Sequence, residues 1–310
     1  MIRIAAPAVA EVVLWSCWLD LEALKPGNVS VQAPGHGMSA ADFIRSAEAA
    51  APLLCAQDSS VGERILRSIE ATQRAVGCNT NLGIVLLCAP LVHSVLMESP
   101  EGRLRPRLKA VLRSLTHDDT SRVFAAIALA APAGLGRRER YDVHSDPTVS
   151  LCRAMAEAQT WDRIAFQYAN DFIEIFDIGV ACIERYIKPG CNDAMALQWA
   201  TVACYLRFLA AFPDSHIERK FGPERAEGVR RSAKGVESRF KACENLINAM
   251  PLLQEFDNNL KRAGLNPGTS ADLTVASLLA FHLEYLLAGL NSDQGVAAAI
   301  ARGEILFRNK

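Results

Sequence analysis

Residues 75–91, AVGCNTNLGIVLLCAPL, change character halfway along. Gly77 to Asn81 are small or polar, and almost every residue from Leu82 onward is apolar. The apolar part predicts a helix that is buried on all sides. This helix therefore begins with three consecutive polar side chains, those of residues 79–81, although one is enough to cap a helix.

The composition of the chain indicates a helical protein. Half of the 310 residues are hydrophobic and only 7% are aromatic, with alanine and leucine predominating. Such a chain is long enough to bury a sizeable core and is rich in good helix formers. The 33 basic and 34 acidic residues leave a net charge of −1. The sequence thus lacks the excess of basic residues that marks a nucleic-acid-binding protein.

The cysteines and the N-terminus indicate the compartment. The nine cysteines are an odd number without a C-x-x-C pair, and most lie in apolar runs. Buried thiols in a reducing compartment explain this pattern better than disulfides or a zinc site. Glu11 interrupts the apolar N-terminal stretch, and no later segment approaches 18 uninterrupted apolar residues. We therefore expect a cytoplasmic protein with no membrane partner.

Helical patterns recur along the whole chain, and strand alternation is nowhere sustained. We predict one all-α domain over residues 1–310, with ten or more helices. The run PAGLGRRERYDVHSDP, residues 132–147, is the richest in turn and charged residues and predicts a loop that forms part of a site. The expected helices span residues 3–23, 42–56, 61–76, 82–97, 107–116, 119–131, 148–159, 161–187, 192–211, 223–246, 248–263, 270–289 and 293–306.

Polar residues gather at four joints between apolar helices. Any one of these clusters is explained by helix capping, but each contains more polar groups than a cap requires. Helix N-termini also bind phosphate, and carboxylates in apolar surroundings need a partner or a cation. We expect the clusters to line one cavity that binds Mg²⁺ and a polyphosphate. These four polar clusters are EALKPGNVS (22–30), GCNTNLG (77–83), FPDSHIERKFG (212–222) and LNPGTSADL (265–273).

The order and spacing of these motifs resemble the triphosphoribosyl-dephospho-CoA synthase family, as does DRIAFQYANDFIEIFD (162–177). The resemblance runs from about residue 11 to about residue 290. It implies an all-α fold and transfer of the triphosphoribosyl group of ATP to the 2′-hydroxyl of 3′-dephospho-CoA, with release of adenine. The product is the precursor of the prosthetic group of the acyl carrier subunits of citrate lyase or malonate decarboxylase. ATP, dephospho-CoA and Mg²⁺ are therefore the expected ligands, and a homodimer is left open.

The resemblance also implies roles for individual residues. Asp214 and Asp272 would bind Mg²⁺ and stabilise the positive charge that develops on the ribose. His36 or His216 would accept the proton of the acceptor hydroxyl. Arg163 would reach a phosphate or form a salt bridge on its helix. The remaining phosphate- and nucleotide-binding candidates are Lys25, Gly27, Asn28, Asn79, Thr80, Asn81, Gly83, Ser215 and Ser270.

The chain departs from the family pattern at three motifs. The family's T-P-K-P-G-L-V-D is A-L-K-P-G-N-V-S here and lacks the acidic residue after Val29. The family's N-T-H-K-G is N-T-N-L-G here, so Asn81 and Leu82 replace a histidine and a lysine, and its D-T-N is D-S-H. The chain thus resembles a divergent subgroup linked to tetrahydromethanopterin or methanofuran metabolism, in which the acceptor need not be dephospho-CoA. A helical interaction protein that has lost catalysis is the other alternative, but the retained Lys25, Asn79, Asp214 and Asp272 favour a working site.

Overall fold

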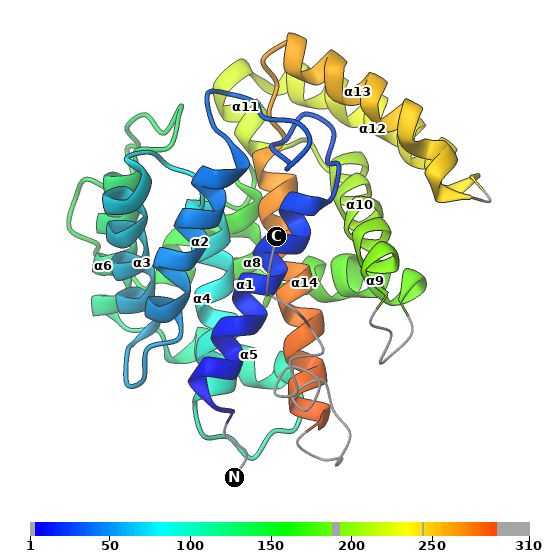
Figure 1. The fold of residues 1–310 in the computed structure, drawn as a ribbon. Helices are drawn as coiled ribbons and strands as arrows, with labels where there is room; N and C mark the ends of the chain where they lie inside the picture. Colours follow the sequence, from blue (N-terminus) through cyan, green and yellow to red (C-terminus); the bar gives the residue numbers. More distant parts are fainter. Residues whose placement is uncertain (1–3, 188–192, 244, 290–310) are drawn as a thin grey trace.

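The computed structural model describes residues 4–187, 193–243 and 245–289 (Figure 1). Within these ranges every regular element is a helix, which confirms the predicted all-α class. The loop after the first helix adds two isolated β-bridges, Ser30 to Ala33 and Gly35 to Met38. The elements are α1 (Ala6–Glu22), α2 (Ala40–Leu54), α3 (Val61–Val76), α4 (Leu82–Leu96), α5 (Leu104–Ser114), α6 (His117–Ala130), α7 (Leu151–Ala158), α8 (Arg163–Ala169), the π-helix η1 (Ile175–Val180), α9 (Ala181–Tyr186), α10 (Ala194–Ala211), α11 (Ser215–Phe221), α12 (Pro223–Lys241), the 3₁₀-helix η2 (Leu246–Ala249), α13 (Met250–Arg262) and α14 (Gly268–Gly289).

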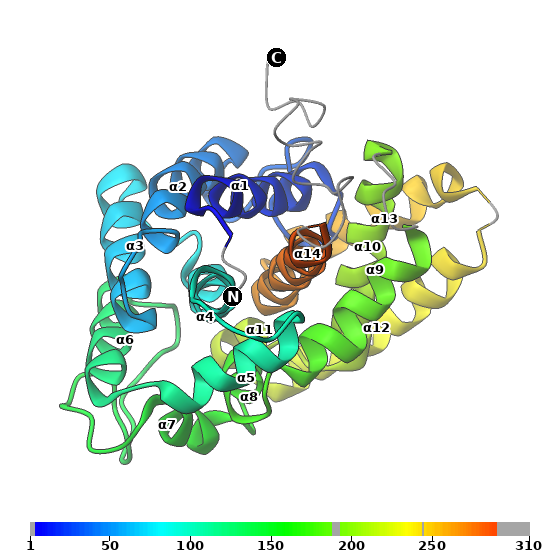
Figure 2. The same cartoon turned by 90° about the horizontal axis from the view of Figure 1, so that it is seen from below.

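Helix α14 is the centre of the fold. Seen along its length in Figure 2, it is surrounded by α1, α4 and α10. Most of its residues are buried, including small ones such as Ala276 and Ser277 that allow neighbouring helices to come close. The helix is therefore apolar on all sides and has no clear polar face, as expected for a helix enclosed by others.

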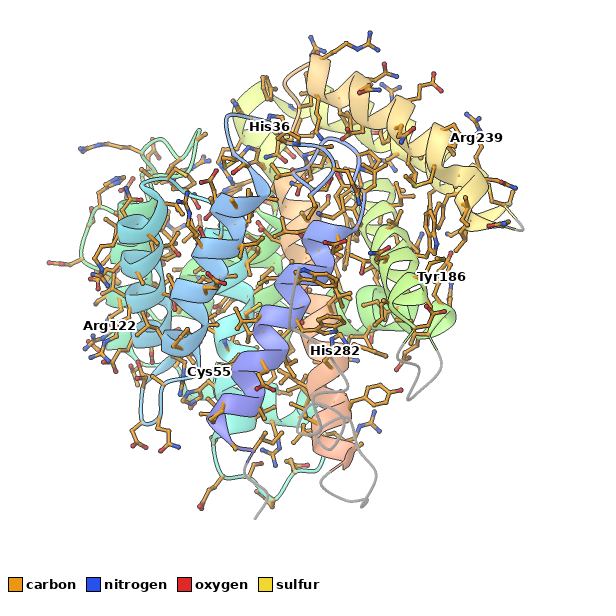
Figure 3. All side chains as sticks on the ribbon, in the orientation of Figure 1. His36, Cys55, Arg122, Tyr186, Arg239 and His282 are labelled. Carbon is orange, nitrogen blue, oxygen red and sulfur yellow. The ribbon has the colours of Figure 1, made fainter. Side chains whose placement is uncertain are left out.

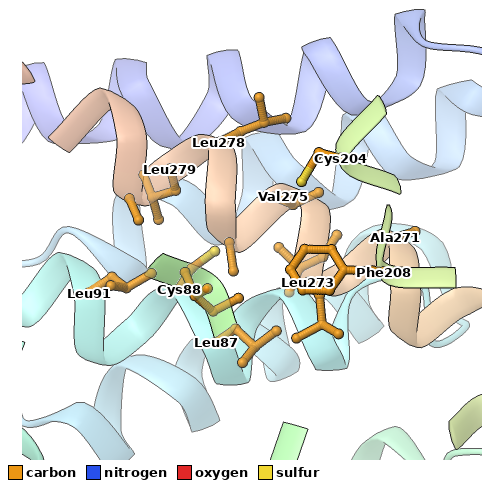
Figure 4. Packing of buried hydrophobic residues seen from close by; sticks show 14 of the residues in the cluster. Leu87, Cys88, Leu91, Cys204, Phe208, Ala271, Leu273, Val275, Leu278 and Leu279 are labelled. Atoms are coloured by element: carbon orange, nitrogen blue, oxygen red, sulfur yellow. The ribbon is translucent and has the colours of Figure 1, made fainter. Parts of the chain in front are cut away.

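Helix α4 is the buried helix predicted at residue 82, and it packs directly on α14. All of its residues except His93 are buried. Figure 4 shows Leu87 and Leu91 of α4 facing Leu279 of α14 across the core. This pairing places the N-termini of α4 and α14 at the same end of the molecule, because Gly83 lies against Asp272 near the start of each helix.

Pro90 lies inside α4 without leaving a buried carbonyl unpaired. A proline has no N–H, so the carbonyl of Leu86, four residues earlier, lacks its helical donor. The hydroxyl of Tyr168 donates to this carbonyl at 2.6 Å, from a fully buried ring on α8. Tyr168 is therefore a core residue.

The prediction of one continuous helix over 161–187 was wrong. Asp171 and Phe172 adopt left-handed backbone angles (φ 51° and 57°) and end α8, and the chain continues as η1 and α9. Gly179 of η1 packs so tightly on α14 that a Cβ there would lie 1.9 Å from the Oγ of Ser277. Helix α11 was missed because it is short, and the helix predicted at 293–306 lies outside the described residues.

Two helices, α10 and α14, are long and apolar enough to cross a membrane by length and composition alone. Within the fold, 61% and 78% of their apolar windows are buried. The eight cysteines in the described ranges are all free, and four of them are fully buried.

His282 on α14 (Figure 3) makes the free energy of unfolding depend on pH. Burial lowers the pKa of its imidazole from 6.5 to about 4. Burial therefore keeps the ring neutral in the folded protein, where Nδ1 donates to the carbonyl of Leu278 at 2.7 Å. Below pH 6.5 the unfolded chain takes up a proton that the folded chain does not, so the free energy of unfolding falls as the pH drops toward 4.

We expect His282 to account for a loss of roughly 2 kcal/mol in the free energy of unfolding between pH 7 and pH 5. His282→Gln should make the stability profile shallower by about this amount, because glutamine does not titrate. Urea unfolding at a series of pH values measures the profile, and exposed His117→Gln is the control. Parallel profiles for the wild type and His282→Gln would contradict the expectation.

Candidate functional site

A cavity of about 750 Å³ lies at the end of the fold where α4 and α14 begin. Each of the four polar clusters contributes to its wall, through Asn28, residues 79–83, His216 and Asp272. The end of α6 and the loop after it form much of the remaining wall, through residues 130–136, Arg138 and residues 140–143. The clusters that lie far apart in the sequence therefore meet at one cavity, as expected from their positions at helix ends.

Lys25 of the K-P-G motif does not line this cavity. Its side chain is fully buried, and Nζ pairs with Asp20 Oδ2 at 3.1 Å. Burial lowers the pKa of Lys25, and the Asp20 carboxylate opposes this shift. Lys25 therefore acts on the cavity through Asp20, which does line it. The geometry does not support the expected direct contact with phosphate.

The rest of the K-P-G loop is anchored to distant helices. Gly27 has a left-handed φ of 84°, and a Cβ there would lie 2.8 Å from side-chain atoms of Leu260 and Pro267. Its N–H donates to Asp257 Oδ1 on α13 at 2.8 Å, and its carbonyl accepts from His36 Nε2 at 2.8 Å (Figure 3). Gly27 and His36 thus stabilise the loop and are not part of the cavity wall.

Asp214 joins two helix N-termini behind the cavity. Its Oδ1 accepts from the N–H groups of His216 (3.0 Å) and Ile217, which caps α11. Its Oδ2 accepts from the N–H and the hydroxyl of Ser270, each at 2.8 Å. Burial raises the pKa of Asp214, and these four hydrogen bonds counteract that shift. Because both oxygens already have protein donors, the geometry does not support the expected metal-ligand role, and Asp214 and Ser270 form a structural joint.

Asp272, by contrast, faces the cavity without a partner. No hydrogen bond or salt bridge joins its carboxylate to another residue of the described chain. Burial raises its pKa well above the usual value, and the negative charge of Asp214 adds to the effect. Its carboxylate lies so close to α4 that a Cβ at Gly83 would be 2.0 Å from Oδ2. Only glycine at position 83 leaves room for the Asp272 carboxylate at the start of α4.

The three polar residues before α4 have three different environments. Asn79 Oδ1 accepts from the N–H of Leu82 at 3.1 Å, which caps the helix. The hydroxyl of Thr80 is 2.5 Å from that of Ser46 on α2. Asn81 makes no capping bond, and its buried Oδ1 has no hydrogen-bond partner. One residue thus caps α4, one joins α2, and one remains unpaired at the cavity.

The two remaining candidates, His216 and Arg163, lie in different environments. His216 lines the cavity, and burial, assisted by Arg219 and Lys220, lowers its pKa to about 4. It is therefore neutral near pH 7 and can accept a hydrogen bond or a proton. Arg163 pairs with the buried Glu174 and is stacked on the rings of Phe166 and Phe212, at 4.1 and 3.7 Å from their centroids. Its backbone N–H donates to Ser215 Oγ at 2.9 Å, so both residues serve the packing of α8 on α11.

Sequence reasoning did not single out Asp20 or Arg219 of the cavity wall. The sequence does not mark Asp20 as a site residue, because a lone aspartate on an amphipathic helix usually faces solvent. Three arginines belong to the wall. Arg138 lies over the ring of Trp161 at 5.0 Å, Arg140 is 3.7 Å from Glu157, and Arg219 pairs with Asp162 at 3.2 Å. Two of them come from the loop over 132–147, whose composition did predict a role in the site.

Comparison with known proteins identifies the family to which the chain belongs. Residues 6–290 match the family model described as ATP:dephospho-CoA triphosphoribosyl transferase, so the chain belongs to this family of ATP-dependent transferases. Its fold is similar to that of a proposed triphosphoribosyl-dephospho-CoA synthase from Archaeoglobus fulgidus, with 24% identity and a TM-score of 0.59 over 78% of this chain and 98% of that one. No curated protein matched the sequence.

The close approach of Asp272 to Gly83 can be tested by a double-mutant cycle. Gly83→Ala should lower the free energy of unfolding by about 1–3 kcal/mol, because the new methyl group would overlap Asp272. In an Asp272→Ala background the same change should cost much less, because only the flexible end of Ile164, whose Cδ1 would lie 2.9 Å from the new methyl group, would still have to move. Urea unfolding of the four proteins measures the coupling.

Gly228→Ala is the matched control, because Gly228 lies within α12 and a Cβ there would meet nothing within 4 Å. It should stabilise the protein by about 1 kcal/mol in either background. Equal effects of Gly83→Ala with and without the Asp272 carboxylate would show that the two residues are not in contact.

Proposed function

We propose that this chain transfers the triphosphoribosyl group of ATP to a hydroxyl of a dephospho-CoA-like acceptor, with adenine as the leaving group. The observation that carries the proposal is the unpaired Asp272 carboxylate, which faces a cavity assembled from all four polar clusters. The family to which the chain belongs supports the same reaction class.

The reaction has one electrostatic requirement that Asp272 can meet. Breaking the bond between C1′ of the ribose and N9 of adenine places positive charge on the sugar. A carboxylate fixed nearby, in a site with limited water, stabilises that charge in the transition state. Because Gly83 admits the carboxylate to the start of α4, its position is set by the packing of two core helices.

The triphosphate would be bound by the N-terminus of α4 and by the arginines of the cavity wall. A helix N-terminus presents free N–H groups and a partial positive charge. Leu82 stands where the resemblance places a lysine, so another cation has to serve the phosphates. Arg138, Arg140 and Arg219 all line the cavity and supply up to three guanidinium groups, which bind phosphate through several N–H donors.

The oxygen ligands of the cavity fit Mg²⁺, the cation expected to accompany ATP. Mg²⁺ is usually held by one or two carboxylates, with water and substrate phosphates completing its shell. Asp272 offers such a carboxylate, with neither oxygen engaged by a protein donor. When bound, the ion would neutralise phosphate charge and orient the nucleotide.

Of the two candidate histidines, His216 is the better supported proton acceptor. It lines the cavity and is neutral near pH 7 because burial lowers its pKa to about 4. His36, the other candidate, is engaged with the carbonyl of Gly27 and does not line the cavity. An acceptor hydroxyl close to His216 could therefore lose its proton as the new bond to the ribose forms.

Adenine release in the presence of ATP, Mg²⁺ and dephospho-CoA tests the reaction, with a tetrahydromethanopterin-type acceptor as the alternative substrate. Asp272→Asn should lower the turnover rate by about 10²–10³-fold, the usual effect of removing one electrostatic group. Its melting temperature should not fall, because no described donor would lose its partner. Wild-type protein that releases no adenine with either acceptor would refute the proposal, and a large fall in melting temperature would assign Asp272 to the structure.

Leu82→Lys tests the departure from the family pattern. Leu82 lines the cavity and is only 8% exposed. A lysine there should tighten ATP binding by roughly threefold to tenfold if its ammonium reaches the triphosphate. Leu82→Met controls for the change of shape. Calorimetric ATP titration and melting temperature together decide the outcome, since severe destabilisation without tighter binding would make Leu82 a core residue.

A further inference from the structure

Two buried oxygen atoms in the cavity wall have no hydrogen-bond donor. They are Oδ1 of Asp20, in the last turns of α1, and Oδ1 of Asn81, just before α4. The two residues are only 5% and 6% exposed. Both line the main cavity, and both also line an adjoining cavity of about 20 Å³. The end of α1 and the residue before α4 therefore each contribute an unpaired acceptor to the wall shared by the two cavities.

These acceptors cannot satisfy each other. An unpaired buried polar group is destabilising, and two acceptor oxygens need a donor or a cation between them. The contacts that Asp20 and Asn81 make within the fold do not involve these two oxygen atoms. Lys25 pairs with Asp20 through Oδ2, and Asn81 does not cap α4.

Asp272 supplies a third oxygen ligand in the same cavity. Its carboxylate is unpaired and lines the same cavity as Asp20 and Asn81. Gly83, against which Asp272 packs, is two residues from Asn81. A carboxylate from α1, an amide from the start of α4 and a carboxylate from α14 thus surround one part of the cavity.

We propose that Asp20, Asn81 and Asp272 bind a divalent cation of the oxygen-preferring class, such as Mg²⁺ or Mn²⁺. The described residues contain no group of three or more His, Cys, Asp or Glu side chains able to hold a metal. The third protein ligand of the proposed site is therefore the amide oxygen of Asn81. Two carboxylates and an amide suit Mg²⁺, which keeps part of its shell for water and phosphate. The proposed function enters only in the choice of the anion that completes the coordination shell of the cation, which would be the triphosphate of ATP.

Lys25 is a positioning residue for this site. By holding Oδ2 of Asp20, its ammonium orients the carboxylate so that Oδ1 is directed away from it. The K-P-G lysine thus contributes to cation binding from within the core. The site differs from the pair predicted from sequence, because Asp20 takes the place of Asp214, whose oxygens have protein donors.

Mn²⁺ titration by calorimetry in the absence of nucleotide tests the site directly. The wild type should bind one Mn²⁺ and melt at a higher temperature when the ion is present. Asn81→Ala should weaken Mn²⁺ binding roughly tenfold or more, since one ligand is lost. Asn81→Asp should strengthen it by a similar factor and should lower the melting temperature without metal, because it adds a negative charge beside two others.

Asp20 is tested together with its partner, because Asp20→Asn alone would leave the buried Lys25 uncompensated. The double variant Asp20→Asn, Lys25→Met removes the charge pair and should abolish most Mn²⁺ binding while the protein still unfolds cooperatively. Asp58→Asn, in an exposed turn where a left-handed φ of 58° suits asparagine, should bind Mn²⁺ like the wild type.

Absence of Mn²⁺ binding to the wild type at millimolar concentrations would overturn the site and leave a buried water between the two acceptors. Unchanged affinity in Asn81→Ala and in the double variant would also overturn it. These outcomes are separate from those of the adenine-release experiment. Mn²⁺ binding with the predicted losses but without adenine release would uphold the site and refute the proposed reaction.

Discussion

The buried ion pair between Lys25 and Asp20 determines how the chain leaves α1 and enters the cavity wall. Neither charge has water to stabilise it, so each depends on the other, and removal of one partner from such a pair usually costs about 3–5 kcal/mol. Lys25 must therefore turn inward immediately after α1 ends. The loop that follows is then held by Tyr205, whose hydroxyl donates to the carbonyl of Pro26 at 2.6 Å, and by Asp257 of α13. This placement brings Asn28 to the cavity, where its side chain also bonds Asn266 at 2.8 Å.

The second constraint is the contact between α4 and α14. Both helices are apolar around their whole circumference, so they can be stable only in the centre of the molecule. Gly83 allows the Asp272 carboxylate to approach the start of α4. The same packing that buries the core thus places an unpaired carboxyl group beside a helix N-terminus, and such a group with a perturbed pKa in a cavity is a candidate for function.

The candidate site could be located from sequence more closely than its chemistry could be assigned. The clusters around Asn79 and Asp272 do meet, because polar residues before buried helices lie at the ends of those helices. The roles of Asp214 and Asp272 could not be told apart, since each is an aspartate near the start of a helix. Asp214 accepts from Ser270, which is 56 residues away, and this contact makes it a joint rather than a free ligand. Asp20 was missed because nothing in its neighbours in sequence shows that Lys25 folds back on it.

The sequence by itself determined the helical class, the position of the buried helix at residue 82 and the four polar clusters that resemble one transferase family. These properties depend on local periodicity and on short motifs, which remain the same in any arrangement of the helices. Only the tertiary structure decided which polar side chains are satisfied and which are free. Asn79 caps α4 and Asn81 does not, although they are the same residue type two positions apart. The physical reason is that a hydrogen-bond acceptor is paired or unpaired according to the donors that other helices bring to it, and those donors lie far away in the chain.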